Sequence, residues 1–591
     1  MYEELTKKLS RLYDKLFKNK VEPSRELIEA CNYLELPYET PFNVAKASIV
    51  ITAASAIILT LAFLTVLHNN ISIPVIVAIL SIPIIINHLY SDYYKEKYYF
   101  ERVKDLGYLP DFFSIIITNL KIKPNLETAL LNTIRFEYGK ITRSAKKLIN
   151  ELRSGKKYDV KDALQNITKE FNNPSVNRAM SLILTSLSIK DSNRRRELLN
   201  MSLNQLLKGM VYESEKFSKK LYIPVLLLFS FGTILPLVII SVIPIISIIR
   251  GSSFNIYTII FFFLLTLIIT KIIVDGLKKK NPSRFSQIII KKDEKGVSII
   301  LLMVLFLGIS SPAIIYLMSI VLPYQLNFLQ GYQTLFLYAA LSLCFSLYFY
   351  SKSSALIKEK KKIEIFEHEM IDAFFNLGGR INEGRSVEDS LKYVSDVSSE
   401  GYAKKVFGEG YKKIKHGGFS LEQVFNKIHV MDRLYSQRIK GLSEVFVESA
   451  KRHSTTAGEN IIELCNYYNS IYESEEEMTN SMSKNTDMIK LTMTLFAPMV
   501  CALVINMQRL IFQTITKTEI LNIGFSPLNI ENVQLVVSLY VFFLTLILNY
   551  FYSFVENNNE KISTNYNAFM NIIVSCAVFT ATLIISRFLL F

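Results

Sequence analysis

The side chains best able to bind a charged partner are clusters of lysine and arginine. They are Lys156 and Lys157, then Arg194, Arg195 and Arg196, and then Lys404, Lys405, Lys412, Lys413 and Lys415. Such clusters attract anionic lipid headgroups or an acidic protein surface. The alternative is a solvated basic face beside a membrane, with no specific ligand. We interpret these residues as candidate contacts with a protein partner or with lipid.

Residues in patterns typical of catalysis are missing from the sequence. Gly139-Lys140-Ile141 and Gly155-Lys156-Lys157 lack the Ser or Thr that ends a phosphate-binding loop. The six histidines do not pair at metal-ligand spacing, and the consecutive carboxylates Glu475–Glu477 point in different directions on a helix. We therefore expect no catalytic residue, no metal and no cofactor. We also expect no nucleic-acid partner, because no base-reading motif accompanies the positive charge.

Long uncharged stretches alternate with highly charged ones, which indicates a membrane protein. Five cysteines without a CxxC pair argue against disulfides and zinc. A membrane-spanning helix needs about 20 apolar residues. Nine segments satisfy this: 48–67, 71–89, 222–249, 256–275, 297–320, 332–350, 491–507, 534–554 and 570–591.

The distribution of basic residues predicts the orientation of these spans. The loop 276–296 holds seven basic residues, whereas 250–255 holds one and 321–331 none. Cytoplasmic loops carry the excess of Lys and Arg. With a basic N-terminal segment and nine spans, we expect the N-terminus in the cytoplasm and the C-terminus outside. The polar insertions 90–221 and 351–489 then lie in the cytoplasm.

These two insertions resemble each other at a nearly constant spacing. Asp111-Phe112-Phe113 matches Asp372-Ala373-Phe374, and Leu126–Leu130 matches Val387–Leu391, both 261 residues apart. Tyr212–Glu215 matches Tyr472–Glu475 at a spacing of 260. A spacing held over about a hundred residues indicates a duplicated domain.

Each copy has the pattern of about six short helices. Apolar residues recur at helical spacing, Ser420 with Gln423 fits a capping box, and Ser386 and Asn125 fit helix starts. We expect an all-α fold with nine transmembrane helices and two homologous cytoplasmic six-helix bundles. The expected regions are 1–47 (cytoplasmic), 48–89 (a membrane hairpin), 90–221 (first bundle), 222–350 (four spans), 351–489 (second bundle) and 490–591 (three spans).

The bundle resembles the type II secretion F domain family. The resemblance rests on Leu109-Pro110-Asp111-Phe112-Phe113, on Asn125–Leu130, and on Lys216 followed by Pro224 and Pro244. Ile223, which precedes Pro224, departs from the family's pattern. The second copy also departs from it, because only Pro498 lies in a comparable place. The length and the duplication are more similar to the archaeal platform proteins of archaella and type IV pili.

This resemblance implies an inner-membrane platform protein. Its implied partners are a hexameric secretion ATPase, pilin-like or archaellin subunits, membrane lipids and a second copy in a homodimer. The alternative is a secondary transporter or channel built from parallel repeats. Transporters place ionisable groups near the middle of the membrane, and we expect the predicted spans to hold none there.

The charge of the two insertions suggests where the ATPase docks. Residues 91–221 hold 25 basic and 15 acidic residues, a net charge of +10, whereas residues 351–489 hold 20 and 22, a net charge of −2. We expect an acidic ATPase surface to bind mainly the first insertion, through Arg194–Arg196, Lys156 and Lys157.

Overall fold

In the computed structural model, all the regular structure of the described residues is helical. The structure describes residues 2–16, 21–66, 90–154, 160–169, 171, 173–250, 256–278, 333–426, 434, 436–451, 454–517, 530–557 and 561–590. The predicted spans 71–89 and 297–320 lie outside this part of the chain. The all-α prediction is confirmed for the described residues.

Seven stretches of described helix are long and apolar enough to cross a membrane. They lie in α3 (Thr40–Val66), in α11 (Ser192–Phe229) continued by α12 (Leu235–Arg250), in α13 (Ile256–Lys278), in α16 (Gln333–Asn382), in α22 (Ser454–Leu491) continued by α23 (Ala497–Lys517), in α24 (Ile530–Asn557) and in α25 (Lys561–Leu590). Each overlaps one of the predicted spans.

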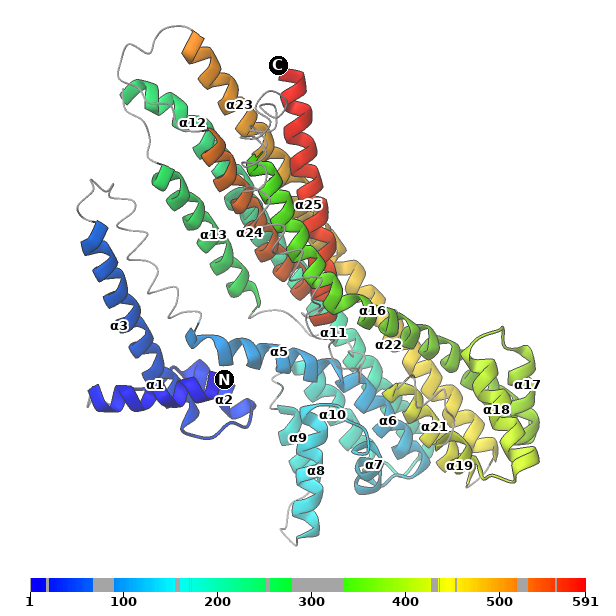
Figure 1. Ribbon diagram of the computed structural model, residues 1–591. Helices are drawn as coiled ribbons and strands as arrows, with labels where there is room; N and C mark the ends of the chain where they lie inside the picture. Colours follow the sequence, from blue (N-terminus) through cyan, green and yellow to red (C-terminus); the bar gives the residue numbers. More distant parts are fainter. Residues whose placement is uncertain are drawn as a thin grey trace.

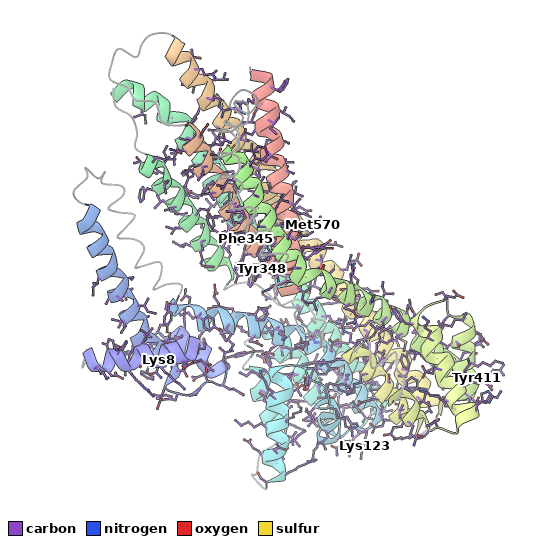
Figure 2. The ribbon with its side chains drawn as sticks, in the orientation of Figure 1. Lys8, Lys123, Phe345, Tyr348, Tyr411 and Met570 are labelled. Atoms are coloured by element: carbon purple, nitrogen blue, oxygen red, sulfur yellow. The ribbon has the colours of Figure 1, made fainter. Side chains whose placement is uncertain are left out.

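These apolar helices form the upper part of the molecule, where α12, α13, α23, α24, α25 and the start of α16 run side by side (Figure 1). Their inward-facing residues, such as Val541 and Phe579, are fully buried. Their outward faces are also apolar: Phe345 and Met570, labelled in Figure 2, are 41% and 45% exposed. Apolar residues on both faces are typical of helices surrounded by lipid.

The lower part contains two sets of shorter helices. We call α5 to α11 the first unit; it comprises α5 (Tyr93–Gly107), α6 (Leu109–Ile122), α7 (Leu126–Thr133), α8 (Lys140–Arg153), α9 (Val160–Lys169), α10 (Pro174–Ser186) and α11. We call α16 to α22 the second unit; it comprises α16, α17 (Val387–Val397), α18 (Tyr402–Gly417), α19 (Leu421–Asn426), α21 (Gln437–Ala450) and α22.

Helices occur in the same order and at nearly the same spacing in both units. α7 and α17 begin 261 residues apart, α8 and α18 262, α9 and α19 261, and α11 and α22 262. Asp111 lies 14 residues before the N-cap Asn125, and Asp372 lies 14 residues before the N-cap Ser386. The two aspartates therefore occupy equivalent positions relative to the helix that follows.

The predicted helix starts are confirmed by side-chain caps. The Thr128 amide donates to Asn125 Oδ1 at 3.0 Å, and the Asp389 amide donates to Ser386 Oγ at 3.1 Å. Ser420 and Gln423 form a reciprocal capping box, with backbone-to-side-chain distances of 3.1 and 3.4 Å. Each cap satisfies backbone donors at the start of a helix that have no partner within it.

The lower part of the molecule has one continuous hydrophobic core, to which both units contribute. Phe112 and Ile115 of α6 belong to the same buried cluster as Phe366 and Phe374 of α16 and Phe446 of α21. The long helices α11 and α22 pack against each other and extend from this core toward the apolar helices (Figure 1). The expected boundaries at 221/222, 350/351 and 489/490 fall inside α11, α16 and α22 respectively.

Each long helix contains a π-helical turn at the same place. η1 (Ser230–Ile234) follows α11 and η2 (Thr492–Phe496) follows α22, again 262 residues apart. A proline lies two residues after each turn, Pro236 and Pro498, and Phe229 contacts Phe496 with ring centroids 5.9 Å apart. The structural equivalent of Pro498 is therefore Pro236, rather than Pro224 or Pro244.

The N-terminal helices α1 (Tyr2–Leu16) and α2 (Arg25–Tyr33) pack beside α3 and α5. Tyr33 OH donates to Asp105 Oδ2 at 3.0 Å, and the Lys140 amide donates to Asp105 Oδ1 at 2.9 Å. Burial raises the pKa of the Asp105 carboxyl, and these two hydrogen bonds oppose the shift. Asp105 thus joins the N-terminal segment to the first unit.

Candidate functional site

The first unit contacts the second through a buried ion-pair cluster centred on Arg438. Ser436 caps α21 by accepting from the Ile439 amide, which places Arg438 in the first turn. Arg438 Nε lies 2.9 Å from Asp111 Oδ1 of α6, and Nη1 lies 3.8 Å from Glu367 Oε2 of α16. All three side chains are buried. One guanidinium therefore joins helices of both units.

Hydrogen bonds from two hydroxyl groups complete this cluster. Ser436 Oγ donates to Glu367 Oε1 at 2.5 Å, and Tyr472 OH donates to Glu367 Oε2 at 2.8 Å. Burial alone lowers the pKa of Arg438, but the adjacent Asp111 and Glu367 carboxylates hold it well above its usual value. Arg438 therefore stays charged, and its removal leaves two buried carboxylates without their cation.

A second polar cluster lies at the last turn of α6, around Lys121. Its Nζ lies 2.8 Å from Glu463 Oε2, 2.7 Å from Tyr467 OH and 2.5 Å from Asn200 Oδ1. Burial lowers the pKa of Lys121, and the hydrogen bond and charge of Glu463 oppose this. All three ammonium hydrogens have a partner, so Lys121 fixes α6 against both α11 and α22.

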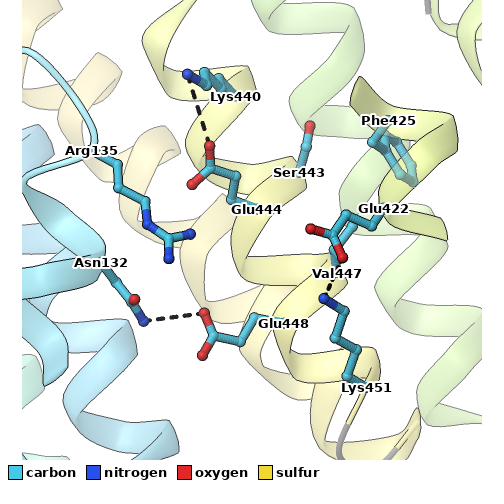
Figure 3. A pocket seen from close by; sticks show the side chains of 10 residues that line it. All are labelled: Asn132, Arg135, Glu422, Phe425, Lys440, Ser443, Glu444, Val447, Glu448 and Lys451. Atoms are coloured by element: carbon cyan, nitrogen blue, oxygen red, sulfur yellow. Dashed lines mark hydrogen bonds and ion pairs between the residues drawn. The ribbon is translucent and has the colours of Figure 1, made fainter. Parts of the chain in front are cut away.

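A polar cavity of about 380 Å³ opens at the edge of the same interface (Figure 3). Asn132 and Arg135 line it from the first unit, and charged residues of α19 and α21 line it from the second. Asn132 Nδ2 donates to Glu448 Oε2 at 3.1 Å. Burial raises the pKa of Glu444, and the nearby Lys440 and Arg135 oppose the shift.

The charges around this cavity balance each other. The cationic residues are Arg135, Lys440 and Lys451, and the acidic ones are Glu422, Glu444 and Glu448. Figure 3 shows the Arg135 guanidinium directed toward Glu444 and Glu448. A cavity whose charges balance is expected to bind a polar side chain of a partner in preference to a free anion. Binding of a free anion requires a net positive charge in the lining.

The predicted arginine cluster lies in the first turn of α11, after its N-cap Asp191. Arg194 and Arg196 are exposed, and Arg195 Nη1 donates to the Ile189 carbonyl at 3.4 Å. Arg196 Nη1 lies 3.8 Å from Glu459 Oε2 of the second unit, with both side chains about half exposed. This cluster is therefore solvent-accessible and close to the inter-unit interface.

The predicted lysines of the second unit lie on α18 (Figure 1), whereas the arginine cluster lies at the start of α11. Lys404, Lys405, Lys412 and Lys415 are exposed, and Lys413 pairs with Glu409 at 2.7 Å. Lys156 and Lys157 lie outside the described residues, and the arginine cluster and the α18 lysines lie on helices of different units. Among the described residues, no group of three His, Cys, Asp or Glu residues has the geometry to hold a metal ion.

The buried clusters around Arg438 and Lys121 were not predicted as sites. Asp111 was named only as part of the repeat and of the family resemblance. The available signal was its charge within the stretch Leu109–Leu120, which is otherwise uncharged and mostly apolar, since a buried carboxylate requires a partner. The identity of that partner, 327 residues further along the chain, depends on tertiary packing.

Comparison of the chain with models of known protein families, with curated proteins and with solved structures finds no match.

Proposed function

We propose that this chain is the membrane platform of a machine that assembles type IV filaments, either archaella or pili, or drives type II secretion. In this proposal it crosses the membrane nine times, with the N-terminus in the cytoplasm and the C-terminus outside. Its two units are homologous six-helix bundles in the cytoplasm. They transmit the motion of a hexameric secretion ATPase to the insertion of pilin-like or archaellin subunits.

The observation that carries this proposal is the continuity of the two long helices. α11 with η1 and α12, and α22 with η2 and α23, each run from the lower core into the apolar helices. A helix is stiff along its axis, so a displacement of either unit is transmitted directly to a membrane span. A platform that converts cytoplasmic motion into movement within the membrane needs such a connection.

The charge distribution supports docking of the ATPase on the first unit. Residues 91–221 carry a net charge of +10, against −2 for residues 351–489. The exposed Arg196 lies beside Glu459 of the second unit, so a partner bound there contacts both units. Anionic lipid is the other ligand suited to the same basic residues.

The decisive experiment is a binding assay between the platform in lipid nanodiscs and the purified secretion ATPase from the same genome. Replacing Lys156, Lys157 and Arg194–Arg196 by Glu should weaken docking and reduce its salt dependence. The matched control replaces Lys404, Lys405, Lys412, Lys413 and Lys415 by Glu, the same number of charges on the other unit. Equal binding by both variants contradicts docking on the first unit, and absence of ATPase binding to the unmodified protein contradicts the proposed function.

A transporter or channel is the second candidate, favoured by polar residues in α23. Asn506, Gln508 and Arg509 are 0%, 2% and 8% exposed within the apolar helices. Asn506 Nδ2 donates to the Leu583 carbonyl at 2.9 Å, and Gln508 Nε2 donates to the Ile240 carbonyl at 2.7 Å. These bonds also explain the residues as helix–helix contacts. An ion flux in proteoliposomes that Arg509→Leu abolishes would favour transport.

A further inference from the structure

The two long helices α11 and α22 touch each other at one constant spacing along the chain. The contacting pairs are Asn200 with Tyr467, Ser214 with Ser481, Ser218 with Asn485, and Phe229 with Phe496. In each pair the two residues are 267 apart, whereas equivalent positions of the two helices are 262 apart. A spacing that stays constant as both residue numbers increase shows that the helices run parallel in a single register.

The same contact continues above the π-helical turns, among the apolar helices. Gln508 Nε2 of α23 donates to the Ile240 carbonyl of α12 at 2.7 Å, a spacing of 268 residues. From Asn200 to Ile240 a helix advances about 60 Å, at about 1.5 Å per residue. Two helices that cross at the common angle of about 50° separate within a few turns. Contact over this length therefore requires nearly parallel axes.

The side chains in the lower part of this contact are small, polar and interlocked. Ser214 is fully buried, and its Oγ lies 3.4 Å from Ser481 Oγ. Ser218 Oγ accepts from Asn485 Nδ2 at 3.0 Å and donates to the Ser481 carbonyl at 2.5 Å. Ser218 thus lies between two residues one helical turn apart on α22. Movement of one helix along the other by part of a turn would leave these buried groups unpaired, which is costly.

Hydrogen bonds hold the two helices together at both ends of the contact. At the lower end, Lys121 Nζ of α6 bonds to Asn200 of α11 and to Glu463 and Tyr467 of α22. At the upper end, Gln508 is 2% exposed and has its partner on α12. Such a bond between apolar helices has no water to replace it. The register is therefore fixed both in the lower core and among the apolar helices.

We propose that α11–η1–α12 and α22–η2–α23 move as one two-helix strut, which keeps the same register in every state of the protein. A displacement of either unit then moves both apolar segments together, along with α24 and α25, which pack on α23. A partner that binds one unit thus acts on the apolar segments of both. The role of the strut in transmitting ATPase motion rests on the proposed function, whereas its fixed register does not.

Disulfide trapping in lipid nanodiscs tests whether the register is unique, because prolonged oxidation also captures rarely populated arrangements. Ser214→Cys with Ser481→Cys should link almost completely. The matched control, Ser214→Cys with Asn485→Cys, is one turn out of register and should not link, since a disulfide requires Cα atoms within about 7 Å. The five native cysteines are buried, and mass spectrometry of the linked peptides identifies the pair. Linking of the control pair, or no linking of the first pair, would overturn the proposal.

A bulky substitution tests whether the lower and upper parts of the strut move together. Ser214→Leu should part the helices at Ser481 and loosen the contact about 22 Å higher. Phe229→Cys and Phe496→Cys should then be linked about tenfold more slowly by a short bifunctional thiol reagent, because overpacking of a buried contact has effects of this size. Asn204→Leu, on the exposed face of α11, is the control and should leave the rate unchanged.

Equal rates for the Ser214→Leu and Asn204→Leu variants would refute the strut. Far-UV circular dichroism checks that each variant is folded, and Ser214→Val, a smaller change, takes the place of Ser214→Leu if that variant is not.

Repeating the trapping while the bound ATPase hydrolyses ATP tests for motion driven by the partner. We expect the pair at 214 and 481 still to link and the pair at 214 and 485 still to remain unlinked. Linking of the second pair during hydrolysis would show that one helix slides past the other, against the proposal. An ATPase that does not bind contradicts the proposed function alone, because trapping in its absence still decides whether the register is fixed.

Discussion

From α7 and α17 onward the described helices of the two units follow the same order, yet equivalent residues lie in different environments. Asp111 is buried against Arg438, whereas Asp372 is exposed to solvent. Counted from the N-caps Ser436 and Asn173, the first-unit equivalent of Arg438 is Ser175. The difference arises because α6 of the first unit packs on the second unit, whereas the equivalent α16 residues Asp372 and Asn376 are exposed. A residue's role in a repeated unit is thus set by the neighbour it meets as well as by its position in the repeat.

The largest expected difference between the units is at this pair of aspartates. Asp111→Ala leaves the Arg438 guanidinium buried without its closest carboxylate, and we expect a loss of about 3–5 kcal/mol of unfolding free energy. Asp372→Ala should change it by less than about 0.5 kcal/mol, because Asp372 is on the surface. Unfolding in detergent can be followed by far-UV circular dichroism, since the chain has no tryptophan. Equal losses would contradict the difference in burial.

A smaller effect is expected where α16 crosses α22 within the second unit. A Cβ added to Gly458 would lie 2.7 Å from the Gly378 carbonyl oxygen and 2.9 Å from the Asn382 nitrogen, which are backbone atoms that cannot move independently. Gly458→Ala should therefore destabilise the protein by about 1–3 kcal/mol. Gly379→Ala is the control, because no atom lies within 4 Å of its added Cβ, and it should be neutral or stabilising. The same unfolding measurement decides between them.

The helix caps should behave alike in the two units. Asn125→Ala and Ser386→Ala each remove one side-chain acceptor from the start of equivalent helices, and each should lower stability by about 1 kcal/mol. Hydrogen exchange of the α7 and α17 amides would report the local loss. If one cap matters and the other does not, the two helix starts are not equivalent.

The smallest effect is expected at the π-helical turns. Tyr540 OH donates to the Gly232 carbonyl in η1 at 2.7 Å, and Thr545 Oγ lies 3.5 Å from the Met493 carbonyl in η2. Tyr540→Phe should lower stability by about 0.5–1.5 kcal/mol. Thr545→Val should have less effect through η2, because its bond to that turn is long. A larger loss for Thr545→Val would show that η2 depends more on α24 than η1 does.

The sequence predicted the features that depend on local composition. Hydropathy located the seven described membrane-length helices, and the caps at Asn125, Ser386 and Ser420 were identified from residue type and spacing. The cluster around Arg438 could not be predicted, because Asp111 and Arg438 meet only through the packing of one unit on the other. The π-helical turns were also missed, since one additional residue in a turn scarcely changes the apolar pattern of a lipid-facing helix.

The paired π-helical turns set the rotation of each long helix about its own axis. An α-helix advances about 100° per residue, so the additional residue of a π-turn rotates everything beyond it by about that angle relative to an uninterrupted helix. η1 and η2 make this correction at equivalent positions in both units. Deleting the additional residue of a turn would restore a regular α-helical turn and keep the same faces of α12 or α23 toward their neighbours, whereas deleting a residue elsewhere in the helix would rotate one part against the other by about 100°. Each turn therefore absorbs one residue of chain length without changing which faces the helix presents to the lower core and to the apolar helices.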